Sequence, residues 1–385
     1  MLMSRRRVLI VQPYVPDYRV QMFSKLSERA REMDIDVLVA AGQPSFRDAA
    51  RSDAVSGLPW MQDMSDRKFS LGRWEFKRRL VAPTLSSYKP THVIVEQALH
   101  NLDTYEIAVW AKRFSAALGA WGHGATYTQR KSHIHRKAKD LLTRRTSWFF
   151  VYTDGGQQYL RNHGYPSSRI TVLRNAGDTK ELQRDLTNIG PEELANFQHD
   201  HGLSSGKTAI FLGGLDSRKA LPFLLSAVQR IEGRLPDFKL IIGGDGELAS
   251  ELHRLQQEGA PIRVLGRLEG RLKALALASA SIMMVPEWVG LVSVDSLVAG
   301  VPIVTTQHWS HAPEFEYLTN GRTCVVTPHT VADYASQAHD LLCDRARLDK
   351  MRENAQQDSF GLSAESMARN FAVGMRSWIE RTSTQ

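Results

Sequence analysis

The stretch VPEWVGLVSVDSLVAGVPIVTT, residues 285–306, contains the pattern that determines the predicted fold. An apolar run at residues 281–285 predicts a buried strand. Residues 292–299 predict a helix, and the apolar run at residues 303–305 predicts a second strand. A strand, a helix and a further strand in this order are typical of a parallel βαβ unit.

Three residues in this stretch have the chemistry of a ligand site. Glu287 lies at the end of the first strand, Gly290 lies just before the helix, and Asp295 lies one turn inside it. A glycine at that place lets backbone amides approach a ligand closely, and a helix N-terminus favours an anion such as phosphate. Because carboxylates do not bind phosphate, we expect Glu287 and Asp295 to accept hydrogen bonds from sugar hydroxyl groups.

The same alternation extends over most of the chain and predicts parallel sheets covered by helices on both faces. Further strands are expected at residues 7–11, 36–40, 92–96, 118–121, 148–152, 171–173, 209–212, 239–242 and 263–265. Further helices are expected at residues 20–33, 220–231, 248–258 and 272–278, with the last helices between 331 and 381.

A polar stretch at residues 179–207 interrupts the alternation and is interpreted as the connection between two domains. A length of 385 residues is also about twice that of a typical domain. The sequence therefore predicts an α/β protein with two doubly wound, Rossmann-like domains, residues 1–185 and 186–363, and a ligand-binding cleft between them. The C-terminal helix, residues 364–385, is expected to pack back on the first domain.

The composition argues against several classes of protein. The two cysteines, Cys324 and Cys343, form no CxxC pair and no cluster with histidines, which disfavours a disulfide framework or a structural zinc site. The apolar run after the N-terminal arginines is too short for a signal peptide, and no stretch approaches the length of a membrane span. We therefore expect a cytoplasmic protein that does not cross a bilayer.

The net charge of +8 is concentrated in two basic clusters in the N-terminal half. The first comprises Arg130, Lys131, Arg136, Lys137, Lys139, Arg144 and Arg145, and the second comprises Arg73, Lys77, Arg78 and Arg79. Because nucleic-acid-binding motifs are missing there and the first cluster contains no Phe, Trp or Tyr, these clusters favour an anionic membrane surface over nucleic acid as the partner. The alternative that they are only solvated helix faces stays open.

Two more motifs place glycines directly after an expected strand. They are FLGGLDSRKALPFLLSA, residues 211–227, and KLIIGGDGEL, residues 239–248. In the first, Lys219 lies just before a helix, where a lysine can clamp a diphosphate. Each motif alone is weak evidence, because lysines near helix starts and isolated glycine turns are common.

The order and spacing of the three motifs together resemble the donor-binding half of glycosyltransferase family four, whose GT-B fold has two facing Rossmann-like domains. Members typically show Gly-Arg-Leu followed after three residues by Lys-Gly. In this chain Leu215 and Lys219 match that motif, with Gly214 in place of its arginine and Ala220 in place of its second glycine.

The other two family motifs are a Gly-Asp-Gly turn and a pair of glutamates separated by seven residues that include Gly-Leu-Val. Residues 244–246 match the first of these, and the segment from Glu287 to Asp295 matches the second, with aspartate as the final carboxylate. The N-terminal half also ends in the Asn-Ala-x-Asp pattern familiar from the family, at residues 175–178.

The resemblance implies a role for each of these residues. Lys219 would hold the donor diphosphate, Glu287 would be a catalytic residue at the donor sugar or distal phosphate, and Asp295 would bind the ribose hydroxyls. Arg218 either replaces the missing arginine or faces solvent, and Arg267 is expected at the base pocket. The other donor-binding residues implied are Gly214, Gly244, Asp245, Gly246, Gly290, Leu291 and Val292.

In the N-terminal half the resemblance implies that His123, within WGHG at residues 121–124, is a catalytic residue that contacts the transferred sugar. A histidine between two glycines at a strand end is more accessible than a core histidine. The loop after the first strand is expected to supply acceptor or phosphate contacts, or only packing, from Tyr14, Asp17, Tyr18 and Arg19.

The resemblance thus implies a retaining glycosyltransferase that moves a hexose from a nucleotide diphosphate sugar to a lipid-linked or cell-surface glycan bound by the N-terminal domain. It implies no cofactor and no metal, and peripheral association with the inner face of a membrane is compatible with the basic clusters. One alternative is a non-catalytic sugar-nucleotide-binding or scaffold protein with the same fold. A nicotinamide-dependent oxidoreductase is disfavoured, because no G-x-G-x-x-G follows the first strand.

Overall fold

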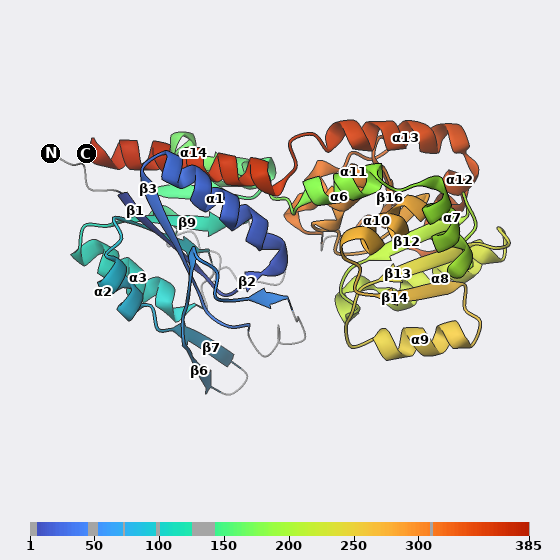
Figure 1. The fold of residues 1–385 in the computed structure, drawn as a ribbon, viewed down its shortest axis with the longest axis horizontal. Coiled ribbons are helices and arrows are strands. Elements are labelled where there is room, and N and C mark those ends of the chain that lie inside the picture. Colours follow the sequence, from blue (N-terminus) through green and yellow to red (C-terminus); the bar gives the residue numbers. More distant parts are fainter. Residues whose placement is uncertain are drawn as a thin grey trace. The chain divides into compact units, whose positions relative to one another are not determined.

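A computed structural model describes residues 6–44, 53–71, 74–97, 101–124, 143–308 and 311–384 (Figure 1). The chain forms two compact units, one of Met1–Asp178 with Ser363–Gln385 and one of Thr179–Leu362. The first division falls just before helix α6 (Thr179–Thr187), which therefore belongs to the second unit, whereas the sequence prediction divided the chain after residue 185.

Within the described residues, the first unit contains a seven-stranded parallel sheet in the order β11-β10-β9-β8-β1-β3-β5. Its strands are β1 (Arg6–Gln12), β3 (Ile35–Ala41), β5 (Met61–Asp63), β8 (His92–Glu96), β9 (Ala117–Gly122), β10 (Trp148–Val151) and β11 (Ile170–Val172). β1 pairs with β3 on one side and with β8 on the other. The strand order therefore reverses between β1 and β8.

Both faces of this sheet are covered by helices, as the four consecutive buried apolar residues of β1, residues 8–11, require (Figure 1). Val8 and Ile10 belong to the core formed with α1 (Val20–Glu32) and α14 (Ala364–Ser383). Leu9 and Val11 belong to the core formed with α2 (Ala82–Tyr88) and α3 (Leu102–Arg113). A further helix, α5 (Asp154–Asn162), follows β10.

The C-terminal helix α14 is an integral part of the first unit. The ring of Phe371 stacks on Phe150 of β10 with the ring centres 4.5 Å apart. Trp378 is fully buried, and its Nε1 donates to Ser147 Oγ at 2.9 Å. Truncating a buried aromatic side chain of this kind to alanine costs roughly 3–5 kcal/mol, so we expect that removal of α14 would unfold this unit.

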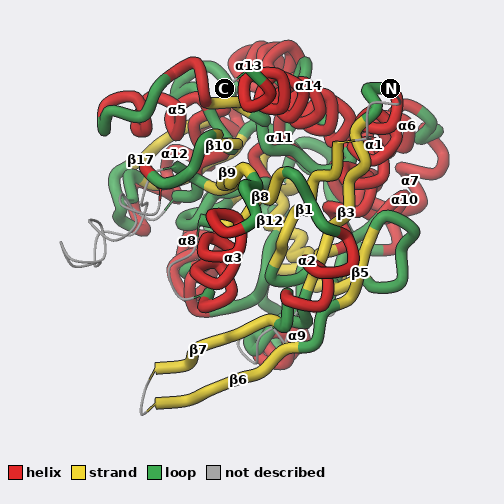
Figure 2. The backbone as a smooth tube through the Cα atoms, turned by 90° about the vertical axis from the view of Figure 1, so that its left-hand side faces the viewer, coloured by secondary structure: helices red, strands yellow, loops and turns green. Residues whose placement is uncertain are grey.

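In the described part of the first unit, two short antiparallel pairs lie outside the main sheet. They are β2 (Val15–Pro16) with β4 (Ala54–Val55), and β6 (Asp66–Leu71) with β7 (Trp74–Arg79). Figure 2 shows β6 and β7 as a long hairpin that runs away from the rest of the first unit. The sequence analysis missed this hairpin because its strands, DRKFSL and WEFKRR, contain charged residues rather than an apolar run.

Within the described residues, the second unit contains a six-stranded parallel sheet in the order β14-β13-β12-β15-β16-β17. Its strands are β12 (Thr208–Leu212), β13 (Lys239–Gly243), β14 (Ile262–Gly266), β15 (Ile282–Met284), β16 (Ile303–Thr306) and β17 (Cys324–Thr327). This is the 3-2-1-4-5-6 order of dinucleotide-binding folds, which reverses between the first and fourth strands. The loops after β12 and β15 therefore flank the place where such folds bind ligands.

The polar stretch predicted as an inter-domain connection is folded into the second unit as α6 and α7 (Pro191–Asp200). Arg271 fixes this stretch, since it donates to the carbonyl oxygens of Asp185 at 2.6 Å and Asn188 at 2.8 Å and pairs with Glu193. The other helices of the unit are α8 (Leu221–Glu232), α9 (Ala249–Gln257), α10 (Gly270–Ser279), α11 (Val292–Ala299), α12 (Val331–Cys343) and α13 (Arg345–Asp358).

Candidate functional site

A hydrogen bond joins the loops after β12 and β15 of the second unit. Lys219, the last residue of the 3-10 helix η3 (Ser217–Lys219), donates from Nζ to the carbonyl oxygen of Trp288 at 2.8 Å. Trp288 follows Glu287 directly and has a φ of 55°, a left-handed conformation that bulky residues rarely adopt. Backbone strain of this kind clusters at binding and catalytic sites. The structure thus brings Lys219 close to the loop that carries Glu287.

Arg218 is turned back onto its own loop. Its Nε donates to Asp216 at 3.1 Å and its Nη2 donates to the same carboxylate at 2.6 Å. The guanidinium also lies over the Trp288 ring, with Cζ 5.6 Å from the ring centre. Burial alone would raise the pKa of Asp216, but the bonds from Arg218 outweigh it and lower the pKa. Of the two predicted diphosphate ligands, Lys219 is therefore directed towards the β15 loop and Arg218 towards Asp216.

The two glycine-rich turns pack directly against each other. Gly213 N donates to Gly243 O at 3.0 Å, and Leu215 N donates to Asp245 O at 2.9 Å, so the turns continue the pairing of β12 and β13. A Cβ atom on Gly244 would lie 1.9 Å from the Gly213 carbonyl oxygen, which no side chain can tolerate. Close packing of backbone therefore accounts for this glycine, and the predicted contact of residues 244–246 with a donor stays a prediction.

His311 fixes the loop between β15 and α11. Its Nδ1 accepts from Val289 N at 3.1 Å, and its Nε2 donates to the Thr306 carbonyl at 2.9 Å. Burial lowers the pKa of His311, although the bond to Thr306 opposes this shift. The ring is therefore neutral near pH 7, as the acceptor role of Nδ1 requires. Through this loop His311 holds in place the predicted phosphate-binding residues Gly290, Leu291 and Val292.

Two of the predicted donor residues form ion pairs within the second unit. Asp295, in the first turn of α11, pairs through Oδ1 with Lys273 Nζ of α10 at 2.7 Å, and each side chain is 26% exposed. Arg267, which follows β14, pairs with Glu269. Neither Lys273 nor Glu269 was predicted as a partner. The ribose and base roles of Asp295 and Arg267 stay predictions.

Glu287 lies between two histidines that the sequence analysis missed. Its Oε1 lies 3.3 Å from His329 Nε2, and its Oε2 lies 3.7 Å from His308 Nδ1. The three residues follow β15, β16 and β17, which are neighbours in the sheet. Carboxyl ends of parallel strands meet at one edge, and this topology brings the three side chains together.

A sequence signal for these histidines did exist. Thr306 and Thr327 are paired across β16 and β17, and each histidine comes two residues after its threonine, in TQH and TPH. Because each histidine follows a paired threonine by two residues, the two histidines lie equally far beyond the carboxyl ends of their strands. The pattern was missed because the short strand Cys324–Thr327 was not predicted.

In the first unit, His123 lies directly after β9 at the carboxyl edge of the sheet and is exposed. Its ring meets that of Tyr152 edge-on, with the ring centres 4.8 Å apart. The guanidinium of Arg19 lies over the rings of both Trp121 and Tyr152, at 5.4 and 5.5 Å. The structure therefore brings His123 and Arg19 to one aromatic cluster at this edge.

The predicted loop after β1 contains regular secondary structure. Its residues form β2 and the 3-10 helix η1 (Asp17–Arg19). The side chain of Arg19 is 5% exposed and donates to Met367 Sδ of α14 at 3.0 Å, so Arg19 takes part in packing, which is one of the roles left open above. Tyr18 is 40% exposed and Tyr14 is half-buried. Asp17 Oδ1 accepts from Tyr18 N at 2.6 Å.

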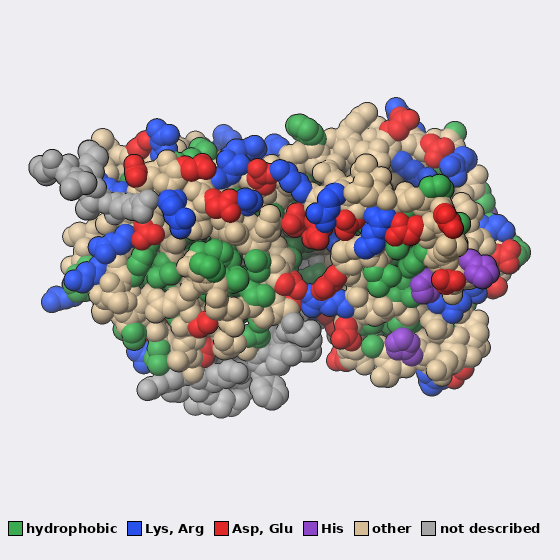
Figure 3. All heavy atoms as spheres, in the orientation of Figure 1, with side chains coloured by type: hydrophobic (Ala, Val, Ile, Leu, Met, Phe, Trp, Pro, Cys, Tyr) green, Lys and Arg blue, Asp and Glu red, His purple; other side chains and the backbone are tan. Residues whose placement is uncertain are grey.

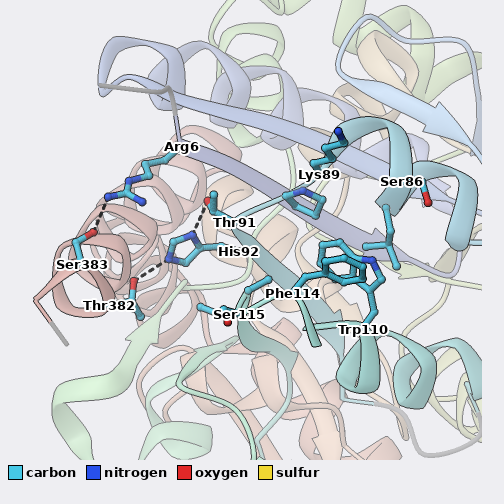
Figure 4. Close-up of a pocket in the computed structure, with 14 residues that line it drawn as sticks. Arg6, Ser86, Lys89, Thr91, His92, Trp110, Phe114, Ser115, Thr382 and Ser383 are labelled. Carbon is cyan, nitrogen blue, oxygen red and sulfur yellow. Dashed lines mark hydrogen bonds between the residues drawn. The ribbon is translucent and has the colours of Figure 1, made fainter. Parts of the chain in front are cut away.

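A cavity of about 660 Å³ lies at the opposite, amino-terminal edge of the first sheet. Figure 4 shows the residues that line it. His92 lies buried beside it, with its two ring nitrogens bonded to the hydroxyl groups of Thr91 at 2.9 Å and Thr382 at 2.8 Å. Burial, assisted by the charge of Arg6, lowers the pKa of His92 to about 4. Because sheets of this type bind ligands at their carboxyl edge, and no predicted site residue lines this cavity, it is a poor candidate for the donor site.

The two basic clusters are described only in part. The residues that lie outside the described part of the chain are Arg73, Arg130, Lys131, Arg136, Lys137 and Lys139. Arg78, whose side chain is 42% exposed, pairs with Glu106 of α3. Arg79 is buried and pairs with Asp103 of the same helix, so Arg79 does not add to an exposed positive field as predicted. On the face drawn in Figure 3, basic and acidic side chains are interspersed. None of the described helices combines the length and hydropathy of a membrane span.

Sequence comparison relates part of the chain to known proteins. Residues 206–344 match the family model described as Glycosyl transferases group 1. Phosphatidyl-myo-inositol mannosyltransferase of Mycobacterium tuberculosis is 34% identical over 106 residues, which cover 26% of this chain and 28% of that protein. The GDP-mannose-dependent alpha-(1-6)-phosphatidylinositol monomannoside mannosyltransferase of Mycolicibacterium smegmatis is 26% identical over 200 residues, 48% of this chain and 50% of that protein. The matches thus span between about a quarter and a half of these relatives.

Solved structures resemble the whole chain. Alr3699/HepE of Anabaena in complex with UDP has a TM-score of 0.71 at 15% identity, and the match covers 97% of this chain and 100% of that one. WaaG, a glycosyltransferase involved in lipopolysaccharide biosynthesis, has a TM-score of 0.66 at 13% identity, with 95% and 98% covered. These similarities confirm the predicted fold of two Rossmann-like α/β domains.

Proposed function

The chain has the fold of the GT-B glycosyltransferases and carries a glycosyl transferases group 1 domain, and from this we infer that it transfers a hexose from a nucleotide diphosphate sugar with retention of configuration. The observation that carries the proposal is the 2.8 Å bond from Lys219 to the Trp288 carbonyl. It holds a cation beside the carboxylate-bearing loop at the place where the strand order reverses. A sugar-nucleotide donor needs a cation to bind its anionic diphosphate and a carboxylate to accept hydrogen bonds from its sugar hydroxyls.

The chemistry of the leaving group supports the role of Lys219. Cleavage of the bond between the sugar and the distal phosphate leaves a charged nucleotide diphosphate. An ammonium group and the backbone N–H groups at the start of α11 stabilise such a charge where it develops. Glu287 then accepts hydrogen bonds from the sugar, and Asp295 from the ribose. Neither a cofactor nor a metal ion is part of this proposed step.

The names of the sequence relatives support a lipid-linked acceptor. Both mannosyltransferases are named for phosphatidylinositol substrates, phosphatidyl-myo-inositol and phosphatidylinositol monomannoside. We assign the acceptor to the N-terminal unit, where exposed His123 would contact the transferred sugar. An acceptor of this kind lies at a membrane surface, so the enzyme would work there as a peripheral protein.

The first unit offers a surface suited to that location. On and after α3, Val109 is 71% exposed and Phe114 is 60% exposed, which is unusual for apolar side chains of this size. Val109 and Lys112 line a groove of about 880 Å³ together with Arg145, the described end of the first basic cluster. Apolar side chains bordered by cations suit a bilayer surface that contains acidic lipids.

The proposal is tested by supplying the protein with a panel of nucleotide sugars, including GDP-mannose and UDP-glucose, and vesicles that contain phosphatidylinositol. We expect one donor to give free nucleotide diphosphate together with a glycosylated lipid. Thermal shift with GDP and UDP would identify the base separately, because a ligand that binds only the folded state raises the melting temperature. Stabilisation by a nucleotide without turnover of any donor would support the non-catalytic alternative.

A further inference from the structure

Three side chains with metal-binding chemistry converge where β15, β16 and β17 end. The ligand atoms of Glu287, His308 and His329 all lie within 4.8 Å of one another. The side chains of Glu287 and His308 are 18% and 19% exposed, and that of His329 is 40% exposed. Each of the three side chains is thus partly accessible to solvent.

The orientation of His329 is fixed by two neighbours. Phe223 of α8 stacks on its ring, with the ring centres 5.0 Å apart and an angle of 11° between the planes. Its Nδ1 lies 3.0 Å from Thr306 Oγ1. Ligating histidines in metal sites usually bond through their second nitrogen in this way, which directs the first nitrogen at the metal.

The hydrogen bond to Thr306 also sets the direction of the second ring nitrogen of His329. Thr306 Oγ1 lies 2.8 Å from the Pro286 carbonyl oxygen and 3.0 Å from His329 Nδ1, so the backbone after β15 and the ring are held by one hydroxyl group. Nε2, on the opposite side of the ring, is thereby directed at Glu287 Oε1, 3.3 Å away.

The distances within the cluster fit a metal ion. Zinc binds histidine nitrogen at roughly 2.0–2.1 Å and carboxylate oxygen at similar lengths, so ligand atoms in a tetrahedral site lie about 3.3–3.5 Å apart. The two oxygens of Glu287 lie 3.3 Å from His329 Nε2 and 3.7 Å from His308 Nδ1, and the ligand atoms of all three residues lie within 4.8 Å of one another, so the side chains have to draw together around the ion to reach this geometry. We propose that Glu287, His308 and His329 bind a divalent transition-metal ion, and that Zn²⁺ matches the site best.

The ligand types and their number set the properties of the site. Two imidazoles with one carboxylate favour Zn²⁺ over Mg²⁺, which prefers oxygen ligands in octahedral geometry. Three protein ligands leave a fourth position for water or another oxygen ligand. A bound ion would engage the carboxylate of Glu287 that the proposed function assigns to the donor sugar. The proposed metal binding does not rest on that function. It departs from the sequence-based expectation that the site holds no metal.

The test uses the full chain after removal of metal with a chelator. Isothermal titration with ZnCl₂ is expected to show one ion bound per chain, and titration with MgCl₂ is expected to show no binding. Addition of Co²⁺ should produce the visible absorption of tetrahedral cobalt, which Zn²⁺ then abolishes. Absence of Zn²⁺ binding and of the cobalt spectrum in the wild-type protein would overturn the proposal without bearing on glycosyl transfer.

Two ligand variants and one control locate the ion. His308→Gln and His329→Gln should each weaken Zn²⁺ binding by more than about tenfold, since loss of even an outer partner costs that much. His253→Gln is the matched control, because His253 is an exposed histidine on α9 outside the cluster. Circular dichroism checks that each variant is folded. Unchanged Zn²⁺ affinity in both ligand variants would place the ion elsewhere and refute the assigned site.

Discussion

Lys219 and Trp288 are joined by a 2.8 Å hydrogen bond from the lysine ammonium to the tryptophan backbone carbonyl. The bond links the two loops that flank the reversal of strand order in the second sheet. Because an ammonium group has three donor protons, this bond leaves it able to donate to a phosphate oxygen as well. The carbonyl therefore positions Lys219 without excluding the role that we propose for it.

We predict that Lys219→Ala weakens binding of the nucleotide diphosphate more than Arg218→Ala does. Loss of a charge-assisted hydrogen bond to the diphosphate costs roughly 1.5–3 kcal/mol. Arg218 is already engaged by Asp216, so its removal should change the affinity less. Calorimetric titration of the two variants and the wild type with the nucleotide measures the difference, and equal affinities for Lys219→Ala and wild type would exclude the clamp.

We predict that His123→Ala lowers turnover by more than tenfold while binding of the nucleotide diphosphate changes little. General acid–base or positioning contacts at the reacting centre contribute about 100-fold or more, whereas the proposed nucleotide ligands all belong to the other unit. His163→Ala is a suitable control, because His163 is exposed and lies beyond α5 in the same unit. A loss of nucleotide affinity with normal turnover would remove His123 from the transfer site.

We predict that the stability of the first unit falls between pH 7 and pH 5 because of His92. Burial lowers the pKa of His92 from 6.5 to about 4, so over this range the unfolded chain takes up a proton that the folded chain does not. Stability therefore rises with pH, and this group should contribute on the order of 1–2 kcal/mol to the difference. Urea unfolding at both pH values should show a smaller pH dependence for His92→Gln than for the wild type.

We predict salt-sensitive binding to vesicles that contain phosphatidylglycerol. Each basic residue close to an acidic surface contributes about 1 kcal/mol, and salt screens this attraction. Replacing Arg144 and Arg145 with glutamate should weaken binding at low salt, and Phe114→Ala should weaken it at both low and high salt, because it removes apolar contact. Flotation assays measure the effects, and failure of the wild type to bind at low salt would contradict the prediction.

The sequence predicted those features that depend on local pattern. The strand His92–Glu96 and the helix Val292–Ala299 were predicted with the observed bounds, because an apolar run or helical periodicity identifies each of them without reference to distant residues. The edge strand Cys324–Thr327 was missed, and with it the position of His329, because only three apolar residues stand between polar residues on both sides.

Side-chain partners from distant segments were beyond the sequence analysis. Nothing near Asp295 in the sequence indicates that Lys273, on another helix, is its ion-pair partner. Arg79 was likewise predicted to belong to a basic cluster that favours an anionic membrane surface, whereas the fold buries it against Asp103. Such ion pairs form when whole helices and strands pack against each other, so they cannot be predicted from local propensity.

The last prediction concerns Asp295, whose proposed role as the ribose ligand has to be separated from its ion pair with Lys273. An ionised carboxylate can accept hydrogen bonds from both hydroxyls of a ribose, whereas an amide accepts through one oxygen only. We therefore expect Asp295→Asn to lose roughly 1.5–3 kcal/mol of affinity for the nucleotide diphosphate. Asp295→Glu, which restores the residue of the family motif, should keep much of it.

Lys273→Met is the matched variant, because it breaks the same ion pair and leaves the carboxylate in place. A partly exposed pair of this kind contributes at most about 1 kcal/mol to folding, so both variants should melt at similarly reduced temperatures. Only Asp295→Asn should also lose discrimination between the nucleotide and its 2′-deoxy analogue. If Asp295→Asn lowers the melting temperature but binds both nucleotides as the wild type does, the carboxylate stabilises the packing of α10 against α11 and is not a ribose ligand.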